Sequence, residues 1–122
     1  MSILSYSYII GVCILNKNKQ LLYEKQAEIA KSMAHPLRMA ILDFLNKGDQ
    51  CVCDIAEFVG SERSNVSRHL AVMVNAGILE YRKEGLKVIY KLKCKCVTEF
   101  FNCAMDVIKQ QVKENEKMLR AL

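Results

Sequence analysis

The chain has 122 residues and a net charge of +5, which is enough for one domain with a modest core. The charge is uneven: residues 61–95 carry the whole excess of Lys and Arg, and the rest of the chain is neutral. Such a block favours a polyanionic partner, although a merely solvated basic face would look the same. Without a signal peptide or a membrane-spanning run, the six cysteines favour reduced thiols in the cytoplasm over secreted disulfides.

The first 17 residues are apolar and contain Cys13. Their β-branched and aromatic residues favour a short strand or an arm packed on a partner subunit. From about residue 18 to residue 34 we expect a helix, because apolar residues recur on one loose face. That face consists of Leu22, Ile29, Ala30 and Met33.

Three further helices follow with clear apolar spacing. The first begins at Pro36 and ends at Gly48, and its apolar face is Leu37, Ala40, Ile41, Phe44 and Leu45. The next begins near Gln50 and ends at Gly60, with Val52, Ile55, Ala56 and Val59 facing inward. The last runs from about Ser64 to Ala76, with Val66, Leu70 and Met73 facing inward, and Gly77 ends it. A short helix, a glycine turn and a second helix predict a helix-turn-helix.

The period then changes from helical to alternating. Leu79, Tyr81, Val88, Tyr90 and Leu92 alternate with polar residues around a basic turn at 83–86, which predicts a β-hairpin wing. A long helix from about Val97 carries one apolar stripe with little local core left to cover, so we expect it to pair with a second copy. The predicted fold is therefore mainly α with a β-hairpin wing. It is a single winged helix-turn-helix domain (1–122) with an arm (1–17), a core (18–92) and a C-terminal dimerisation helix (93–122).

The predicted second helix of this motif carries side chains suited to the major groove of DNA. Arg pairs with guanine and Asn with adenine, so Arg68 and Asn65 are the candidates for base reading, and Arg63 and Ser64 for phosphate. His69 is more easily explained by local packing than by a DNA contact. The full set of candidate DNA-binding residues is Arg63, Ser64, Asn65, Ser67, Arg68 and His69 in the helix, and Arg82, Lys83 and Lys87 in the wing.

Cys51 and Cys53 stand at the start of the helix that precedes this candidate recognition helix. Residues two apart lie on different faces of a regular helix, so joint coordination of an ion requires a non-helical first turn. Such coordination would distort the helix that supports the recognition helix. Soft thiolate ligands favour As(III), Sb(III), Cd(II), Pb(II) or Zn(II) over hard cations.

The order and spacing of four segments resemble the ArsR/SmtB family of metal-sensing repressors. They are residues 34–42 (AHPLRMAIL), 51–56 (CVCDIA), 65–70 (NVSRHL) and 77–85 (GILEYRKEG), within about residues 22–92. The second segment resembles the cadmium/lead and arsenic/antimony branches in particular. The resemblance implies a homodimer that represses its own operator and leaves DNA when the ion binds.

The resemblance also bears on which cysteines hold the ion. The arsenic branch often has a third Cys where this chain has Ala56, which departs from that pattern. In the cadmium/lead branch, N-terminal cysteines of the other subunit complete the site, and Cys13 is the candidate for that role. The leading set is therefore Cys13, Cys51 and Cys53. Some family members sense metals near the last helix, so Cys94, Cys96 and Cys103 form the rival site.

Two other functions stay open at this point. A redox repressor could use a disulfide between distant cysteines, and a winged-helix module could bind protein in place of DNA. An enzyme is not expected, because the chain shows no nucleophile–base pair and no Gly-rich phosphate loop. No organic cofactor is expected either.

Overall fold

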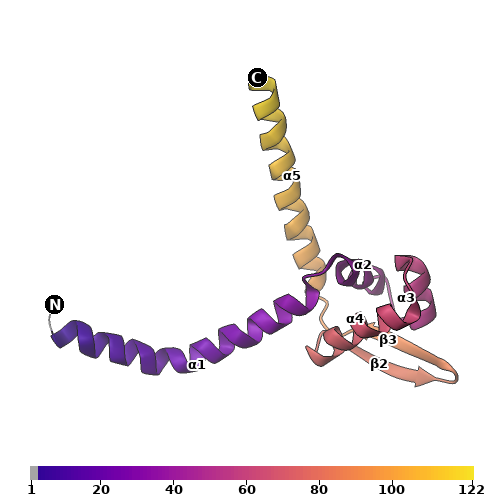
Figure 1. Ribbon diagram of the computed structural model, residues 1–122, viewed down its shortest axis with the longest axis horizontal. Coiled ribbons are helices and arrows are strands. Elements are labelled where there is room, and N and C mark those ends of the chain that lie inside the picture. Colours follow the sequence, from indigo (N-terminus) through magenta and orange to yellow (C-terminus); the bar gives the residue numbers. More distant parts are fainter. Residues whose placement is uncertain (1–2) are drawn as a thin grey trace.

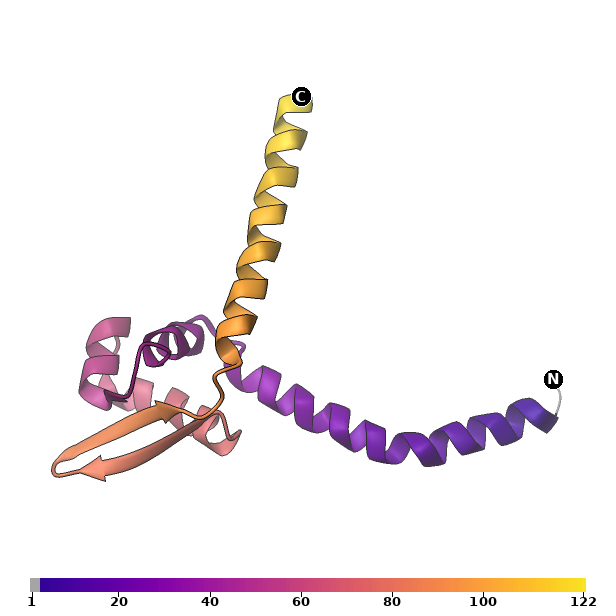
Figure 2. The same ribbon diagram turned by 180° about the vertical axis from the view of Figure 1, so that it is seen from behind.

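The computed structural model describes the backbone of residues 3–122 and the side chains of residues 17–122. Its elements are α1 (Ile3–Met33), α2 (Pro36–Leu45), β1 (Gln50–Cys51), α3 (Val52–Val59), α4 (Arg63–Asn75), β2 (Leu79–Glu84), β3 (Lys87–Leu92) and α5 (Val97–Ala121). The three short helices and the hairpin form one core, and α1 and α5 leave it in different directions (Figures 1 and 2). This is the mainly helical fold with a hairpin wing that the sequence predicted.

The core lies where α2, α3 and α4 meet the base of the hairpin. Its fully buried members include some of the predicted inward residues of each helix and also Leu42, which was not on the predicted face, because each helix buries one apolar side. They are Ile41 and Leu42 from α2, Ile55 from α3, Val66, Leu70 and Met73 from α4, and Leu79 from β2. The core therefore fixes α4 against α3 with the opposite face of α4 free.

The sheet holds three antiparallel strands in the order β1–β3–β2. The hairpin register runs from Leu79 opposite Leu92 to Glu84 opposite Lys87. Strand β1 adds Cys51 opposite Ile89 on the other side of β3. The sequence predicted the hairpin but placed Gln50 and Cys51 in the third helix, which was wrong: that helix begins at Val52. A two-residue strand has no periodicity of its own, so only its pairing with β3 reveals it.

The N-terminal helix is longer than expected. We expected an arm or short strand over residues 1–17 and a helix from about residue 18, but α1 is continuous from Ile3 to Met33. No proline interrupts residues 3–33, and extending an existing helix is easier than starting a separate element. Ser32 is buried at its end, and Pro36 begins the next helix.

Helix α5 presents most of its apolar stripe to solvent in a single chain. Within this helix Ile108, Val112 and Leu119 are all at least half exposed, and only Val97 at its start is buried. Exposure of a long apolar stripe is unusual for a solitary domain. Over the described part of the chain, no helix combines the length and the apolarity that crossing a membrane requires.

Candidate DNA-binding surface and thiol sites

Helix α4 shows two chemically distinct faces. Val66, Leu70 and Met73 anchor one face in the core, so the opposite face is turned outward. Four of the predicted DNA-binding residues are exposed there: Arg63, Ser64, Ser67 and Arg68. The turn before α4 is closed by Gly60, whose φ of 66° is the left-handed conformation that ends α3. The helix-turn-helix thus presents a polar, cationic surface of the kind that enters a major groove.

Asn65 is positioned by its own neighbour. Its side-chain Nδ2 donates to the hydroxyl of Ser61 at 2.9 Å, across the first turn of α4. The carbonyl oxygen of the Asn65 side chain has no hydrogen-bond partner among the described residues. The amide nitrogen has a second N–H, so Asn65 can keep the Ser61 bond and still offer one donor and one acceptor to adenine.

His69 makes contacts inside the domain, as in the local packing that the sequence analysis preferred over a DNA contact. Arg38 of α2 donates from Nε to Nδ1 of His69 at 3.1 Å, and the rings of His35 and His69 lie 4.5 Å apart. Burial lowers the pKa of His69, and the positive charges of His35, Arg38 and Arg68 lower it further. His69 therefore accepts a hydrogen bond inside the helix bundle in the described structure.

Arg38 is a residue that the sequence analysis missed. Besides its bond to His69, its Nη1 donates to the carbonyl oxygens of Lys31 and Ser32 at 3.5 and 3.4 Å. It therefore links the end of α1, α2 and the recognition helix α4. The only sequence signal was an arginine on a largely apolar helix, and such a signal does not identify its hydrogen-bond partners.

The wing residues divide into two groups. Arg82 is held by two carboxylates: its Nη1 bonds Asp49 and its Nε bonds Glu84, both at 2.8 Å. Lys83 and Lys87 are exposed beside the turn of the hairpin. Among the side chains described, Lys83 and Lys87 form no ion pair, so both are available to a phosphate.

Cys51 occupies the junction of a strand and a helix. Its backbone is extended (φ −77°, ψ 156°), it pairs with Ile89, and its Sγ accepts the N–H of Asp54 at 3.4 Å as the cap of α3. The side chain is 4% exposed. Burial foremost raises the pKa of the Cys51 thiol, and the Asp54 N–H opposes that shift.

Cys53 follows within the first turn of α3 and is half-buried. The Cys53 side chain also contributes to the raised pKa of Cys51. Because Cys51 is not helical, the geometric objection to joint coordination by residues two apart does not apply. The cap and the first turn of α3 therefore each carry one candidate sulfur ligand.

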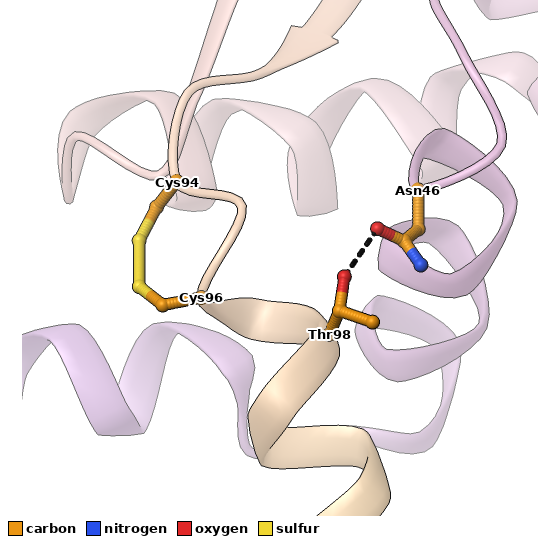
Figure 3. The surroundings of a disulfide bond; sticks show 4 residues. All are labelled: Asn46, Cys94, Cys96 and Thr98. Atoms are coloured by element: carbon orange, nitrogen blue, oxygen red, sulfur yellow. Dashed lines mark hydrogen bonds between the residues drawn. A yellow bond between two sulfur atoms is a disulfide. The ribbon is translucent and has the colours of Figure 1, made fainter.

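The rival cysteines form a different arrangement. Cys94 and Cys96 are joined by a disulfide in the segment between β3 and α5, near the hydrogen bond from Thr98 to Asn46 (Figure 3). Cys103 is free and exposed on α5. The structure thus brings two of the three rival residues together and leaves the third apart.

An apolar cavity of about 350 Å³ lies beside this disulfide. Side chains of α1, α5 and the segment from α4 to β2 line it, including Ile29, Ile78 and Phe100. Among the described side chains, no three His, Cys, Asp or Glu residues gather as a metal site. Cys13, the predicted third ligand, has its side chain outside the described residues.

Comparisons with known proteins agree with this geometry. The family model for bacterial regulatory proteins of the arsR family matches residues 35–81. An arsenical resistance operon repressor of Staphylococcus xylosus is 30% identical over 86 residues, which are 70% of this chain and 82% of that protein. A cadmium resistance transcriptional regulatory protein of Staphylococcus aureus is 39% identical over 67 residues, 54% of this chain and 55% of that protein. A homodimeric winged helix-turn-helix DNA-binding domain of Mycobacterium bovis matches with a TM-score of 0.69 at 27% identity, over 79% of this chain and 89% of that one.

Proposed function

This chain belongs to the ArsR/SmtB family of winged-helix transcriptional repressors, and from that premise we propose that a thiophilic ion held by Cys51 and Cys53 releases it from operator DNA. The candidate ions are As(III), Sb(III), Cd(II), Pb(II) and Zn(II), because thiolates are soft ligands. Relatives concerned with arsenical and cadmium resistance support this class of inducer. The family and the fold are those of DNA-binding regulators and not of enzymes.

The observation that carries the proposal is that Cys51 belongs both to a strand and to the cap of a helix. It pairs with wing strand β3 and caps α3, and α3 packs on the recognition helix α4 through Ile55 and Val66 of the shared core. A change at one sulfur atom is therefore transmitted to both DNA-contacting elements. A coupling of about 1–3 kcal/mol, typical of allosteric proteins, corresponds to roughly 5–150-fold weaker DNA binding.

Each thiol must lose its proton to become a ligand. Cys51 and Cys53 would hold the ion through their thiolates, and the ion would supply soft Lewis-acid bonding there. Coordination would engage the Cys51 sulfur that accepts the N–H of Asp54, so it would disturb the cap and the first turn of α3. Because Ile55 in the next turn is fully buried against the core, that change displaces α3 relative to α4.

A second copy of the chain completes this assembly in the proposal. The exposed stripe of α5 and the homodimeric state of the Mycobacterium bovis domain both support a homodimer. Cys13 lies on α1, about 30 Å along the helix from Met33 at the rise of roughly 1.5 Å per residue. It therefore joins Cys51 and Cys53 as the third sulfur ligand only when it comes from the partner subunit.

The DNA contacts follow from the exposed faces. We assign base reading to Arg68 and Asn65, and phosphate contacts to Arg63, Ser64 and Ser67 on α4. Lys83 and Lys87 supply the wing contacts. Arg68→Ala is expected to remove operator-specific binding, while loss of a wing lysine weakens binding to all sequences alike.

The deciding experiment is a gel shift on the upstream DNA with each candidate ion under reducing conditions. The variants Cys51→Ser and Cys13→Ser should bind DNA but stay bound when the ion is added. Serine is a good helix cap, so Cys51→Ser keeps α3 intact. Cys103→Ser is the matched control and should be released like the unmodified protein. If Cys51→Ser is released normally and Cys103→Ser is not, the thiols of α3 are not the sensor.

The Cys94–Cys96 disulfide favours a second candidate function, a thiol redox repressor. In that function a low-molecular-weight disulfide oxidises both thiols: one S–S bond forms between Cys94 and Cys96, the oxidant's S–S bond breaks, and two small thiols leave with the two protons. The pair immediately precedes α5, so its state would act on the orientation of that helix. A redox repressor leaves DNA under oxidant with no ion present, and Cys96→Ser abolishes that release.

A further inference from the structure

The tip of the wing carries an apolar side chain that the hairpin does not require. The strand register ends at Glu84 opposite Lys87, so Gly85 and Leu86 alone make the turn. Gly85 has a φ of 62°, and no other residue type in the described backbone has a positive φ. That combination is typical of a type II′ turn, in which a polar residue usually follows the glycine. Leu86 stands at that position with its side chain fully exposed (106%).

A single exposed leucine is ordinary on protein surfaces and proves nothing by itself. The surroundings of Leu86 are what distinguish it. Lys87 follows it directly and Lys83 stands three residues before it, both are exposed, and the hairpin extends away from the helices as a narrow projection (Figures 1 and 2). An apolar point between two cations is unsuited to a protein core but suited to a groove between two phosphate chains.

Arg82 gives this projection a fixed base. Its bond to Asp49 before β1 ties the hairpin to the loop after α2, and its bond to Glu84 lies within its own strand. The positive charge of an arginine that is paired with two carboxylates is neutralised and no longer attracts a phosphate. Arg82 is therefore better explained as a brace for the wing than as the DNA contact expected from the sequence.

We propose that Leu86 leads the wing into the minor groove beside the site read by α4, with Lys83 and Lys87 on the phosphates of its two walls. The proposal rests on the DNA-binding function above. Apolar side chains of minor-groove proteins enter where the floor of the groove carries no amino groups. A·T pairs have such a floor, whereas the N2 amino group of guanine occupies it in G·C pairs. Leu86 would thus add a preference for A·T pairs at a position that α4 does not touch.

The test measures affinity and its salt dependence for Leu86→Ser on operator DNA. Leu122→Ser is the matched control, because that leucine is also nearly fully exposed (98%) but lies at the end of α5. Leu86→Ser should bind about tenfold more weakly with an unchanged salt slope, since a partly buried leucine is lost but no charge. Lys87→Gln should lower the slope by about one, and Arg82→Gln should leave it unchanged.

Changes in the DNA sequence provide a second test. Flanking A·T pairs are replaced by G·C, and then by inosine·C, which has the major-groove face of G·C but lacks the guanine amino group. For the unmodified protein G·C should weaken binding several-fold and inosine·C should restore it, whereas Leu86→Ser should bind the three DNAs equally.

The outcomes distinguish the proposed role of Leu86 from the DNA-binding function on which it rests. Specific binding by the unmodified protein together with unaltered affinity and flank preference in Leu86→Ser overturns the role of the tip alone. A lower salt slope in Arg82→Gln overturns the brace. Absence of any specific binding by the unmodified protein overturns the DNA-binding function itself.

Discussion

The two Cys-x-Cys pairs of this chain have the same spacing and different structures. Cys51 and Cys53 span the junction of a strand and a helix, where one sulfur is buried and caps α3. Cys94 and Cys96 precede α5 in a segment outside helix and strand, where their sulfurs are bonded to each other. The spacing of the cysteines determines which sulfurs can come together. The surrounding backbone determines which helices or strands are affected when they do. The first pair is connected to α4 and the wing, and the second to α5.

The largest contrast is expected in ion affinity. Replacing both Cys51 and Cys53 by Ser should weaken binding by more than the roughly 10–100-fold that outer-shell changes at metal sites cost. Replacing both Cys94 and Cys96 by Ser should leave the affinity nearly unchanged. Titration under reducing conditions, followed by the thiolate-to-metal absorption band, measures both. Equal losses in the two double variants would show that both pairs contribute to one site.

The next contrast concerns pH. Burial raises the pKa of Cys51, so its thiol is protonated at neutral pH, and binding must displace that proton. Below this pKa the apparent affinity should rise with pH, by up to roughly tenfold per unit for each thiol deprotonated, and fall as pH is lowered. Ion titrations between about pH 6 and pH 8 check the sign. A flat profile would mean that the ion binds ligands that are already deprotonated.

A third contrast is chemical reactivity in the absence of an ion. Buried Cys51 should react with an alkylating reagent roughly tenfold or more slowly than exposed Cys103, because reactivity follows thiolate content and access. Cys94 and Cys96 should react only after reduction. Peptide mapping by mass spectrometry, with and without a reductant, resolves each site. Fast labelling of Cys51 would contradict its burial in the folded protein.

The smallest contrast is in the anchoring of the second pair. Thr98, two residues after Cys96, donates from Oγ1 to Oδ1 of Asn46 at 2.6 Å and so ties the start of α5 to the end of α2 (Figure 3). Thr98→Val should lower the free energy of unfolding by about 1 kcal/mol, a typical value for one hydrogen bond. Urea unfolding measures it. Thr98→Ser keeps the hydroxyl and is the control, and a loss as large in that variant would point to packing.

The sequence predicted the elements whose residues pack against each other in a regular period. The inward residues of α4 are the buried ones, and the predicted alternation produced the hairpin with Leu79 and Leu92 buried at its base. Spacing of this kind is local, so it can be read from one chain. The family resemblance, placed on segments within residues 22–92, is confirmed by the arsR-family match to residues 35–81.

What the sequence missed depends on contacts between distant segments. The pairing of Gln50–Cys51 with β3 and the bond from Arg38 to His69 join residues far apart in the chain. The short strand that was one expectation for residues 1–17 was wrong over residues 3–17, which are helical, because β-branched and aromatic composition is only a weak indicator of strand; the arm on a partner subunit stays a prediction. The assignment of metal ligands and DNA contacts stays a prediction.

The place of Cys51 at the end of β1 also limits how the proposed sensor could be moved into another protein. One residue inserted after Val52 would rotate the second sulfur by about 100° around the helix axis, although the chain would still contain both cysteines. The strand partner Ile89 is equally part of the arrangement, because it holds the first sulfur outside the helix. A graft into a different winged helix must therefore transfer the strand contact as well as the cysteines.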